Sequence, residues 1–331
     1  MKFSIALRSA AITTVAVVLL SQPTLLEGRS TCPDNFFNPE AQLRYYGGFN
    51  LGLHNPDMSC KLPHHWQHEF EQLSAAVASL ELPQVVFKLF STSDCGGFFK
   101  AIPAAINTNT KVWATLWTGH GGRYEQEKEA LRQAIQAFPH AHTWLAGISV
   151  GSEHLHRGEM SAWEISSQIC DIKQMVQYEF GLTGIPVGCA DTGSSLALPY
   201  NQQAMWAADH VNVNTYPFWS QTHIDDAQFQ MTQVLRNFRD LLADDPDKVI
   251  AFGETGWPSV GVYGASFGDV PNAERYWKDV GCWMHKEKIP WVWFEGVDEP
   301  NKPDMGCVGG AEQNWGVLKA GANERKFEMI C

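Results

Sequence analysis

The chain has 331 residues, and its 24 Lys and Arg against 36 Asp and Glu give a formal net charge of −12. This acidic balance argues against nucleic acid or an anionic membrane surface as a partner, because both need clustered basic side chains. Hydrophobic residues make up 44% and charged residues 18%, so the chain can bury a large core and is not disordered.

The N-terminus has the pattern of a secretory signal peptide. Lys2 and Arg8 form a basic segment, and a run of apolar and small residues over 10–20 follows it. That run is too short to cross about 30 Å of hydrocarbon. We therefore expect a leader over residues 1–29, an N-terminal arm over 30–44, one main domain over 45–331, a secreted protein and no membrane anchor.

Eight cysteines follow the leader, and no two are spaced as C-x-x-C. An even number of cysteines in a secreted chain predicts disulfides, but the sequence does not choose among roughly a hundred possible pairings. For Cys170 and Cys189 the alternative is a pair of buried thiols.

Short apolar strands alternate with amphipathic helical patterns beyond the arm. The predicted strands are 45–53, 85–90, 111–117, 145–150, 185–189, 210–214, 249–253 and 291–294. The predicted helices are 66–80, a segment from the capping box Ser161–Glu164 to Gly181, 231–242, and 273–286 after an Asn272 cap. Continuous apolar strands are typical of parallel sheets that are buried on both faces.

Eight strands alternating with helices over about 270 residues predict an α/β fold, a single-domain (β/α)8 TIM barrel. A doubly wound sheet would also alternate. The first strand is not followed by G-x-G-x-x-G, so a dinucleotide-binding version has no support, and we expect no cofactor.

Two of the predicted strands are followed by a glutamate next to glycine. Glu153 comes after the fourth strand and Glu254 after the seventh. In a barrel, residues that follow the strands face the active site. Two convergent carboxylates are what cleavage of a glycosidic bond needs, although a single glutamate at a strand end is more often a helix-entry charge or part of a loop ion pair.

Four segments together resemble a known family. They are VGSE (150–153), NTYPFW (214–219), FGETGWPS (252–259) and WFEGVDEP (293–300), with a looser YGGFNLG at 46–52. In this order they are similar to the fungal branch of glycoside hydrolase family 17, the barrels that act on β-1,3-glucan. The resemblance covers residues 45–318.

The resemblance implies a catalytic domain that works by retention, through a covalent glycosyl-enzyme. It implies Glu153 as acid/base, Glu254 as nucleophile, and Tyr216 as the residue that orients the nucleophile. Retention needs carboxyl groups about 5–5.5 Å apart, where the pair holds one proton near neutral pH. The family contains both hydrolases and glucanosyltransferases, so both activities stay open, with β-1,3-glucan of the fungal cell wall as the expected partner.

Further polar and aromatic residues at the strand ends are candidate sugar-binding residues. They are Ser152, Trp117, Trp219, Trp257, Glu295, Asp298, Glu299 and Lys302. For the four charged residues a structural ion-pair network is the alternative, and we expect Trp291 and Trp293 to be core residues.

Several histidines lie close together in the sequence, as at His154 and His156, but such spacing does not establish convergent ligands, and we expect no metal. The rival to an enzyme is a non-catalytic glucan-binding wall protein on a degenerate barrel. Glu153, Glu254 and Tyr216 argue against it, because binding alone does not require a placed catalytic pair.

Overall fold

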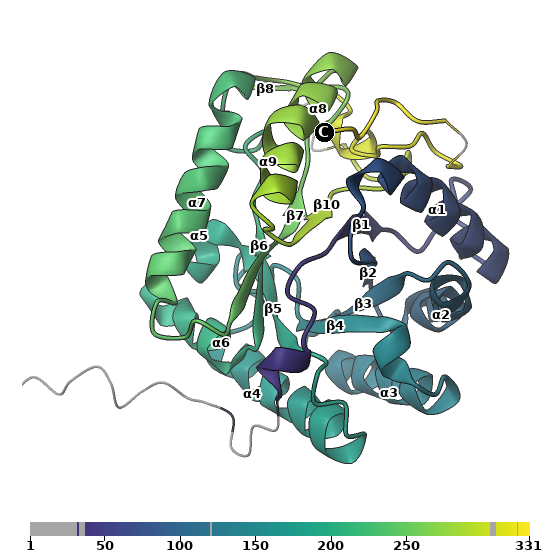
Figure 1. Cartoon of the computed structure of the whole chain (residues 1–331), viewed down its shortest axis with the longest axis vertical. Coiled ribbons are helices and arrows are strands. Elements are labelled where there is room, and N and C mark those ends of the chain that lie inside the picture. Colours follow the sequence, from purple (N-terminus) through teal and green to yellow (C-terminus); the bar gives the residue numbers. More distant parts are fainter. Residues whose placement is uncertain (1–31, 33–36, 120, 305–308, 323) are drawn as a thin grey trace, which may run out of the picture.

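Eight parallel strands close into a barrel in the computed structural model, which describes residues 32, 37–119, 121–304, 309–322 and 324–331. The strand order around the barrel is β1-β10-β7-β6-β5-β4-β3-β2 (Figure 1). Closure confirms the predicted single-domain (β/α)8 barrel and excludes the doubly wound alternative. The strands are β1 Gly47–Leu51, β2 Val85–Phe90, β3 Lys111–Leu116, β4 Leu145–Val150, β5 Val187–Thr192, β6 His210–Asn214, β7 Val249–Thr255 and β10 Trp291–Trp293.

The strands match the predicted ones, with differences at their ends. β5 begins after Pro186, which cannot donate to a strand ladder, and it runs on to Thr192. β7 extends to Thr255, so Glu254 lies within the strand and not behind it. A short hairpin of β8 (Val262–Tyr263) and β9 (Ser266–Phe267) follows β7.

Helices surround the barrel (Figure 1). They are α1 Pro63–Ala76, α2 Gly97–Asn107, α3 Arg123–Ala137, α4 Ala162–Lys173, α5 Gly193–Leu196, α6 Gln202–Ala207, α7 Ala227–Leu241, α8 Val270–Tyr276 and α9 Cys282–Lys286. The predicted capping box before α4 is confirmed: Ser161 Oγ accepts from the Glu164 backbone N–H at 3.3 Å, and Glu164 Oε2 accepts from the Ser161 N–H at 2.7 Å.

The predicted helices differ from the observed ones in their bounds, and four helices were not predicted. The segment 273–286 begins earlier, at Val270, because Asp269 and not Asn272 is its N-cap; the Asp269 carboxylate accepts from the Asn272 N–H at 2.7 Å. Helices α2, α3, α5 and α6 were not predicted at all. Pro103 lies inside α2, and α3 buries only Glu127, Leu131, Ala134 and Ile135.

The core has two parts. A large cluster fills the space between strands and helices, and it includes Trp291 and Trp293, which are fully buried as predicted. A smaller cluster, built around Tyr46 and Trp113, lies on five of the barrel strands and on Tyr46, the residue directly before β1. His210 packs against both rings, and its Nε2 lies 3.0 Å from the Tyr46 hydroxyl. Burial, and then the charge of Lys88, lower the pKa of His210 to about 3, so its ring is uncharged.

Three disulfides join distant parts of the described chain: Cys32–Cys170, Cys60–Cys95 and Cys282–Cys331. The prediction of disulfides is thus confirmed, and of the two cysteines with a buried-thiol alternative only Cys189 is a thiol. Cys307 and the predicted leader lie outside the described residues. Among those residues, no helix has both the length and the apolar character needed to cross a bilayer.

Candidate active site

A cavity of about 580 Å³ opens at the C-terminal ends of the barrel strands. It holds both glutamates singled out in the sequence, Glu153 from the turn after β4 and Glu254 from β7. Residues that follow β1, β2, β3 and β10 form the rest of its wall. The lining residues that matter below are Trp117, Ser152, Arg157, Glu295, Glu299 and Lys302.

Glu254 is surrounded by hydrogen-bond donors. Its Oε1 lies 3.1 Å from Lys88 Nζ and accepts from the Ser152 hydroxyl at 3.4 Å. Its Oε2 accepts from the Tyr216 hydroxyl at 2.7 Å. Lys88 is fully buried in the barrel, so its charge has no counter-ion in solvent and is compensated by Glu254. These contacts fix the carboxylate in one orientation.

Glu153 has a different environment. One of its oxygens accepts from Asn214 Nδ2 at 3.0 Å. Burial, and then the charge of Glu254, raise the pKa of Glu153 to about 7, because both disfavour its anion. Asn214 is also the Cα partner of Glu254 in the β6–β7 register, so the residue that donates to Glu153 lies beside Glu254 in the sheet. The site therefore holds one carboxyl that keeps a proton near neutral pH beside one carboxylate held by a cation.

The residues after β10 form a linked charge network in the same cavity. Lys302 Nζ lies 2.6 Å from a carboxylate oxygen of Glu295 and 2.6 Å from one of Glu299. Burial raises the pKa of Glu295 to about 8, with Lys302 acting against this rise. Glu295 Oε1 is buried and has no hydrogen-bond partner among the described residues, while its other carboxylate oxygen is held by Lys302. The predicted ion-pair network and the predicted sugar contacts are thus compatible.

The other candidate residues are not all in the cavity. Trp117 lines it, with 37% of its surface exposed, and the Arg157 guanidinium lies 4.9 Å from its ring centroid. Three candidate residues, Trp219, Trp257 and Asp298, are not among the described residues that line the cavity.

Those three residues make contacts elsewhere. Trp257 is buried and donates to the Phe267 carbonyl at 2.8 Å. Trp219 packs on Trp315. Asp298 accepts from Lys326 Nζ at 2.7 Å, and it lines a neighbouring cavity.

Two residues of the site were missed in the sequence. Lys88 is the only charge in the strand VVFKLF, and a lone cation inside a strand buried on both faces is itself a sign of a buried anion partner. Asn214 stood in a motif that carried the resemblance but was given no role. Its position at the end of β6, one strand from Glu254, was the available signal.

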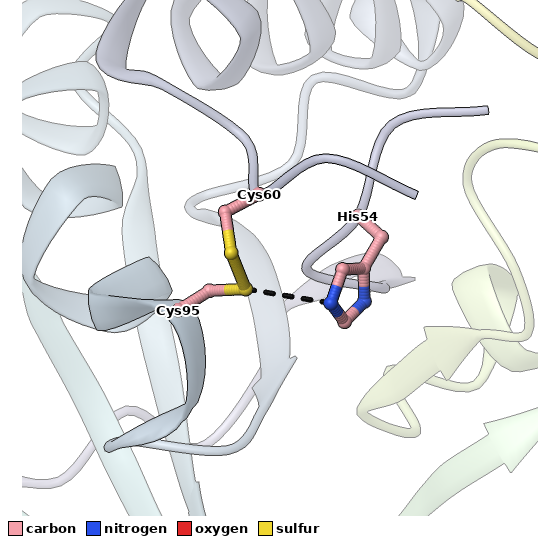
Figure 2. A group of neighbouring side chains, drawn as sticks. All are labelled: His54, Cys60 and Cys95. Atoms are coloured by element: carbon pink, nitrogen blue, oxygen red, sulfur yellow. Dashed lines mark hydrogen bonds between the residues drawn. A yellow bond between two sulfur atoms is a disulfide. The ribbon is translucent and has the colours of Figure 1, made fainter. Parts of the chain in front are cut away.

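One group of side chains in the described chain has the spacing of metal ligands. His54, Cys60 and Cys95 place their ligand atoms within 4.8 Å of one another, and Figure 2 shows His54 directed at the disulfide, 3.4 Å from Cys95 Sγ. The two sulfurs are bonded to each other at 2.01 Å. A disulfide sulfur is not a thiolate, and metals bind thiolates, so this group offers one ordinary ligand.

A barrel that brings one carboxyl group from the turn after β4 and one from β7 into a single cavity has the arrangement of a barrel glycoside hydrolase. Residues 48–316 match the model of the BtgE/BtgC glycoside hydrolase domain, and the chain belongs to this family. The predicted resemblance to the fungal branch of glycoside hydrolase family 17 is confirmed.

Named relatives and a solved structure are consistent with this family. The chain is 30% identical over 292 residues to a glucan 1,3-beta-glucosidase of Candida albicans, covering 86% of this chain and 92% of that protein. It is 27% identical over 296 residues to a glucan 1,3-beta-glucosidase of Saccharomyces cerevisiae, covering 86% and 90%. In fold it is similar to the glycoside hydrolase family 17 β-1,3-glucanosyltransferase of Rhizomucor miehei, with a TM-score of 0.71, 24% identity and coverage of 89% and 99%.

Proposed function

We propose that the protein cleaves β-1,3-glucan with retention, with Glu153 as general acid/base, Glu254 as nucleophile and Tyr216 as the residue that orients Glu254. The observation that carries this proposal is the unequal environment of two carboxyl groups in one cavity. Glu254 is held by Lys88 and two hydroxyl donors, while the pKa of Glu153 is raised to about 7 by burial and by Glu254.

The first step forms the glycosyl-enzyme. A Glu254 oxygen attacks the anomeric carbon as the bond to the leaving oxygen breaks, and Glu153 gives its proton to that oxygen. Glu254 loses its negative charge in the ester, so its share of the rise in the pKa of Glu153 disappears and the pKa of Glu153 falls. Glu153, now ionised, is then a suitable base for the second step.

The second step releases the glycosyl group to an acceptor. Glu153 takes the proton of a water molecule or of a sugar hydroxyl, whose oxygen attacks the anomeric carbon and frees the Glu254 carboxylate. Water gives hydrolysis, and a sugar hydroxyl gives glucanosyl transfer. Both acceptors use the same residues, so both activities remain part of the proposal.

The substrate is proposed from the family and from the cavity together. The relatives are named glucan 1,3-beta-glucosidases. The cavity combines the partly exposed Trp117 with polar groups at Ser152, Glu295, Glu299 and Lys302, the mixture that sugar rings and hydroxyls need. The disulfides and the predicted leader support secretion. We propose a secreted catalytic domain over residues 45–331 that acts on cell-wall glucan.

The pH dependence follows from the state of Glu153. The first step needs its protonated form, so kcat/KM on a glucan oligomer is expected to fall as pH rises through about 7, the pKa of this group. A dinitrophenyl glycoside does not need protonation of its leaving group, so the fall should be much weaker for it. Equal falls for both substrates would assign the titration to another group.

Products from β-1,3-glucan oligomers of one defined length separate the remaining alternatives. Products longer than the starting oligomer demonstrate transfer, and products that are only shorter demonstrate hydrolysis. Binding of the oligomer with no change in its length would contradict the proposal and favour the glucan-binding wall protein.

A further inference from the structure

The turn that carries Glu153 is held by a buried carboxylate from the next strand. Asp191, in β5, is 2% exposed. Its Oδ2 accepts from the Leu155 backbone N–H at 2.8 Å, and its Oδ1 accepts from those of His156 at 3.1 Å and Thr192 at 2.8 Å. We propose that Asp191 is a positioning residue for the proposed acid/base, which acts by fixing the turn after Glu153.

The conformation of Glu153 explains why such a hold is needed. Its φ is +59°, in the left-handed region that residues with a side chain rarely adopt and that persists only when the surroundings impose it. The Glu153 N–H donates to the Ala190 carbonyl at 3.1 Å, and its carbonyl accepts from the Arg157 N–H at 3.0 Å. Asp191 receives the two N–H groups between these contacts, so it closes the turn in the way an N-cap closes a helix.

The other side of Glu153 is fixed by a neutral group. His154 is 1% exposed; its Nδ1 accepts from the Ser152 N–H at 3.0 Å, and its Nε2 lies 2.6 Å from the Thr118 carbonyl. Burial lowers the pKa of His154, which matches an uncharged ring that accepts at Nδ1 and donates at Nε2. The acid therefore lies between two buried supports, of which only Asp191 is charged.

Asp191 also adds to the charge that Glu153 experiences. Three charged residues on three strands act on the acid: Glu254 on β7, Asp191 on β5 and Lys88 on β2. The first two raise the pKa of Glu153 and Lys88 lowers it, as does the hydrogen bond from Asn214 on β6. Removing the charge of Asp191 should consequently move the protonation of Glu153 to lower pH, in addition to loosening the turn.

The test compares two leaving groups in the variant Asp191→Asn. An amide has a single acceptor oxygen, so the variant cannot keep both arms of the contact. We expect kcat/KM for a β-1,3-glucan oligomer to fall about 10²-fold, the scale of general acid catalysis. The fall of kcat/KM with rising pH should also occur at a lower pH than in the wild type. For a dinitrophenyl glycoside, which needs no proton in the first step, kcat/KM should change little.

A second variant and a matched control keep the test decisive if Asp191→Asn folds poorly. Asp191→Glu keeps the charge and displaces the carboxylate oxygens that accept the hydrogen bonds. It should show the same dependence on the leaving group, with a smaller shift in the pH at which kcat/KM falls. Asp209→Asn removes another buried carboxylate, paired with Lys173 at 2.5 Å; it should lower the Tm and leave the ratio of the two kcat/KM values unchanged. Equal losses on both substrates in the Asp191 variants, or no loss, would overturn the inference.

This inference rests on the proposed function, and Glu153→Gln separates the two. If Glu153→Gln is as active as the wild type, the proposed function fails. If Glu153→Gln loses activity on the glucan oligomer and the Asp191 variants do not, only the inference about Asp191 fails.

Discussion

Replacing Glu254 with Gln is expected to lower kcat/KM by about 10⁴-fold or more on every substrate, including those with activated leaving groups. An amide cannot supply the carboxylate that attacks the anomeric carbon, and no change of leaving group removes that need. The measurement is the rate on a dinitrophenyl glycoside and on a glucan oligomer. Residual activity within tenfold of the wild type would remove Glu254 from the role of nucleophile.

The control for folding comes from the cation beside Glu254. In Glu254→Gln the fully buried Lys88 loses its counter-ion, and an uncompensated buried charge is strongly destabilising, so the Tm should fall. The double variant Lys88→Met and Glu254→Gln removes that charge too. It should recover most of the lost Tm and remain inactive, which would show that the activity was lost through chemistry.

Replacing Glu153 with Ala should instead give a loss that depends on the leaving group. Removing a general acid/base costs about 10² to 10⁴-fold in rate, so activity on glucan oligomers should fall by that order. With a dinitrophenyl leaving group the first step should survive and the second step, which needs the base, should limit turnover. Added azide needs no base to attack, so it should raise the rate and give a glycosyl azide with the configuration of the substrate.

Stability provides the check on this variant. Burial, and then the charge of Glu254, raise the pKa of Glu153 from its ordinary value to about 7 in the folded protein. Its contribution to stability is therefore complete below its unfolded pKa and is lost as pH rises through the folded value. At pH 8 the wild type no longer has this contribution, so the Tm of Glu153→Ala should not lie below that of the wild type. Azide without effect, in a variant that is folded, would contradict the acid/base role.

The fold was predictable because the barrel strands are continuous apolar runs in the sequence. Runs such as VVFKLF in β2 and LAGISV in β4 are buried along most or all of their length, and a strand buried on both faces must be apolar throughout. Helix α3 gave no such signal, since only four of its 15 residues are buried. Helix α2 was concealed by Pro103, which normally ends a helix.

The two glutamates of the site could be found because the barrel topology assigns strand ends to one face. The contacts that distinguish them could not be found. Lys88 and Glu254 are 166 residues apart in the chain, and only closure of the barrel brings them together. The disulfides show the same limit: Cys32 and Cys170 are 138 residues apart, and their approach depends on the whole fold.

The aromatic residues show where position along the strand is not enough. Trp117 and Trp257 both lie at strand ends, yet Trp117 lines the cavity and Trp257 is 1% exposed against Phe218 and Tyr276. Most large aromatic rings are core residues. Which ring faces the cavity depends on the direction of its side chain, and that is set by packing after the strand has ended.

The central claim is that Glu254 forms a covalent bond to the sugar beside the proton donor Glu153. It is tested most directly with a dinitrophenyl β-glycoside of a β-1,3-linked glucose oligomer that carries fluorine at the carbon next to the reacting anomeric centre. The fluorine slows both steps, and the activated leaving group still permits the first. Mass spectrometry of peptides from the trapped enzyme should place the added sugar on Glu254. A label on another residue, or no label together with products of inverted configuration, would contradict the account.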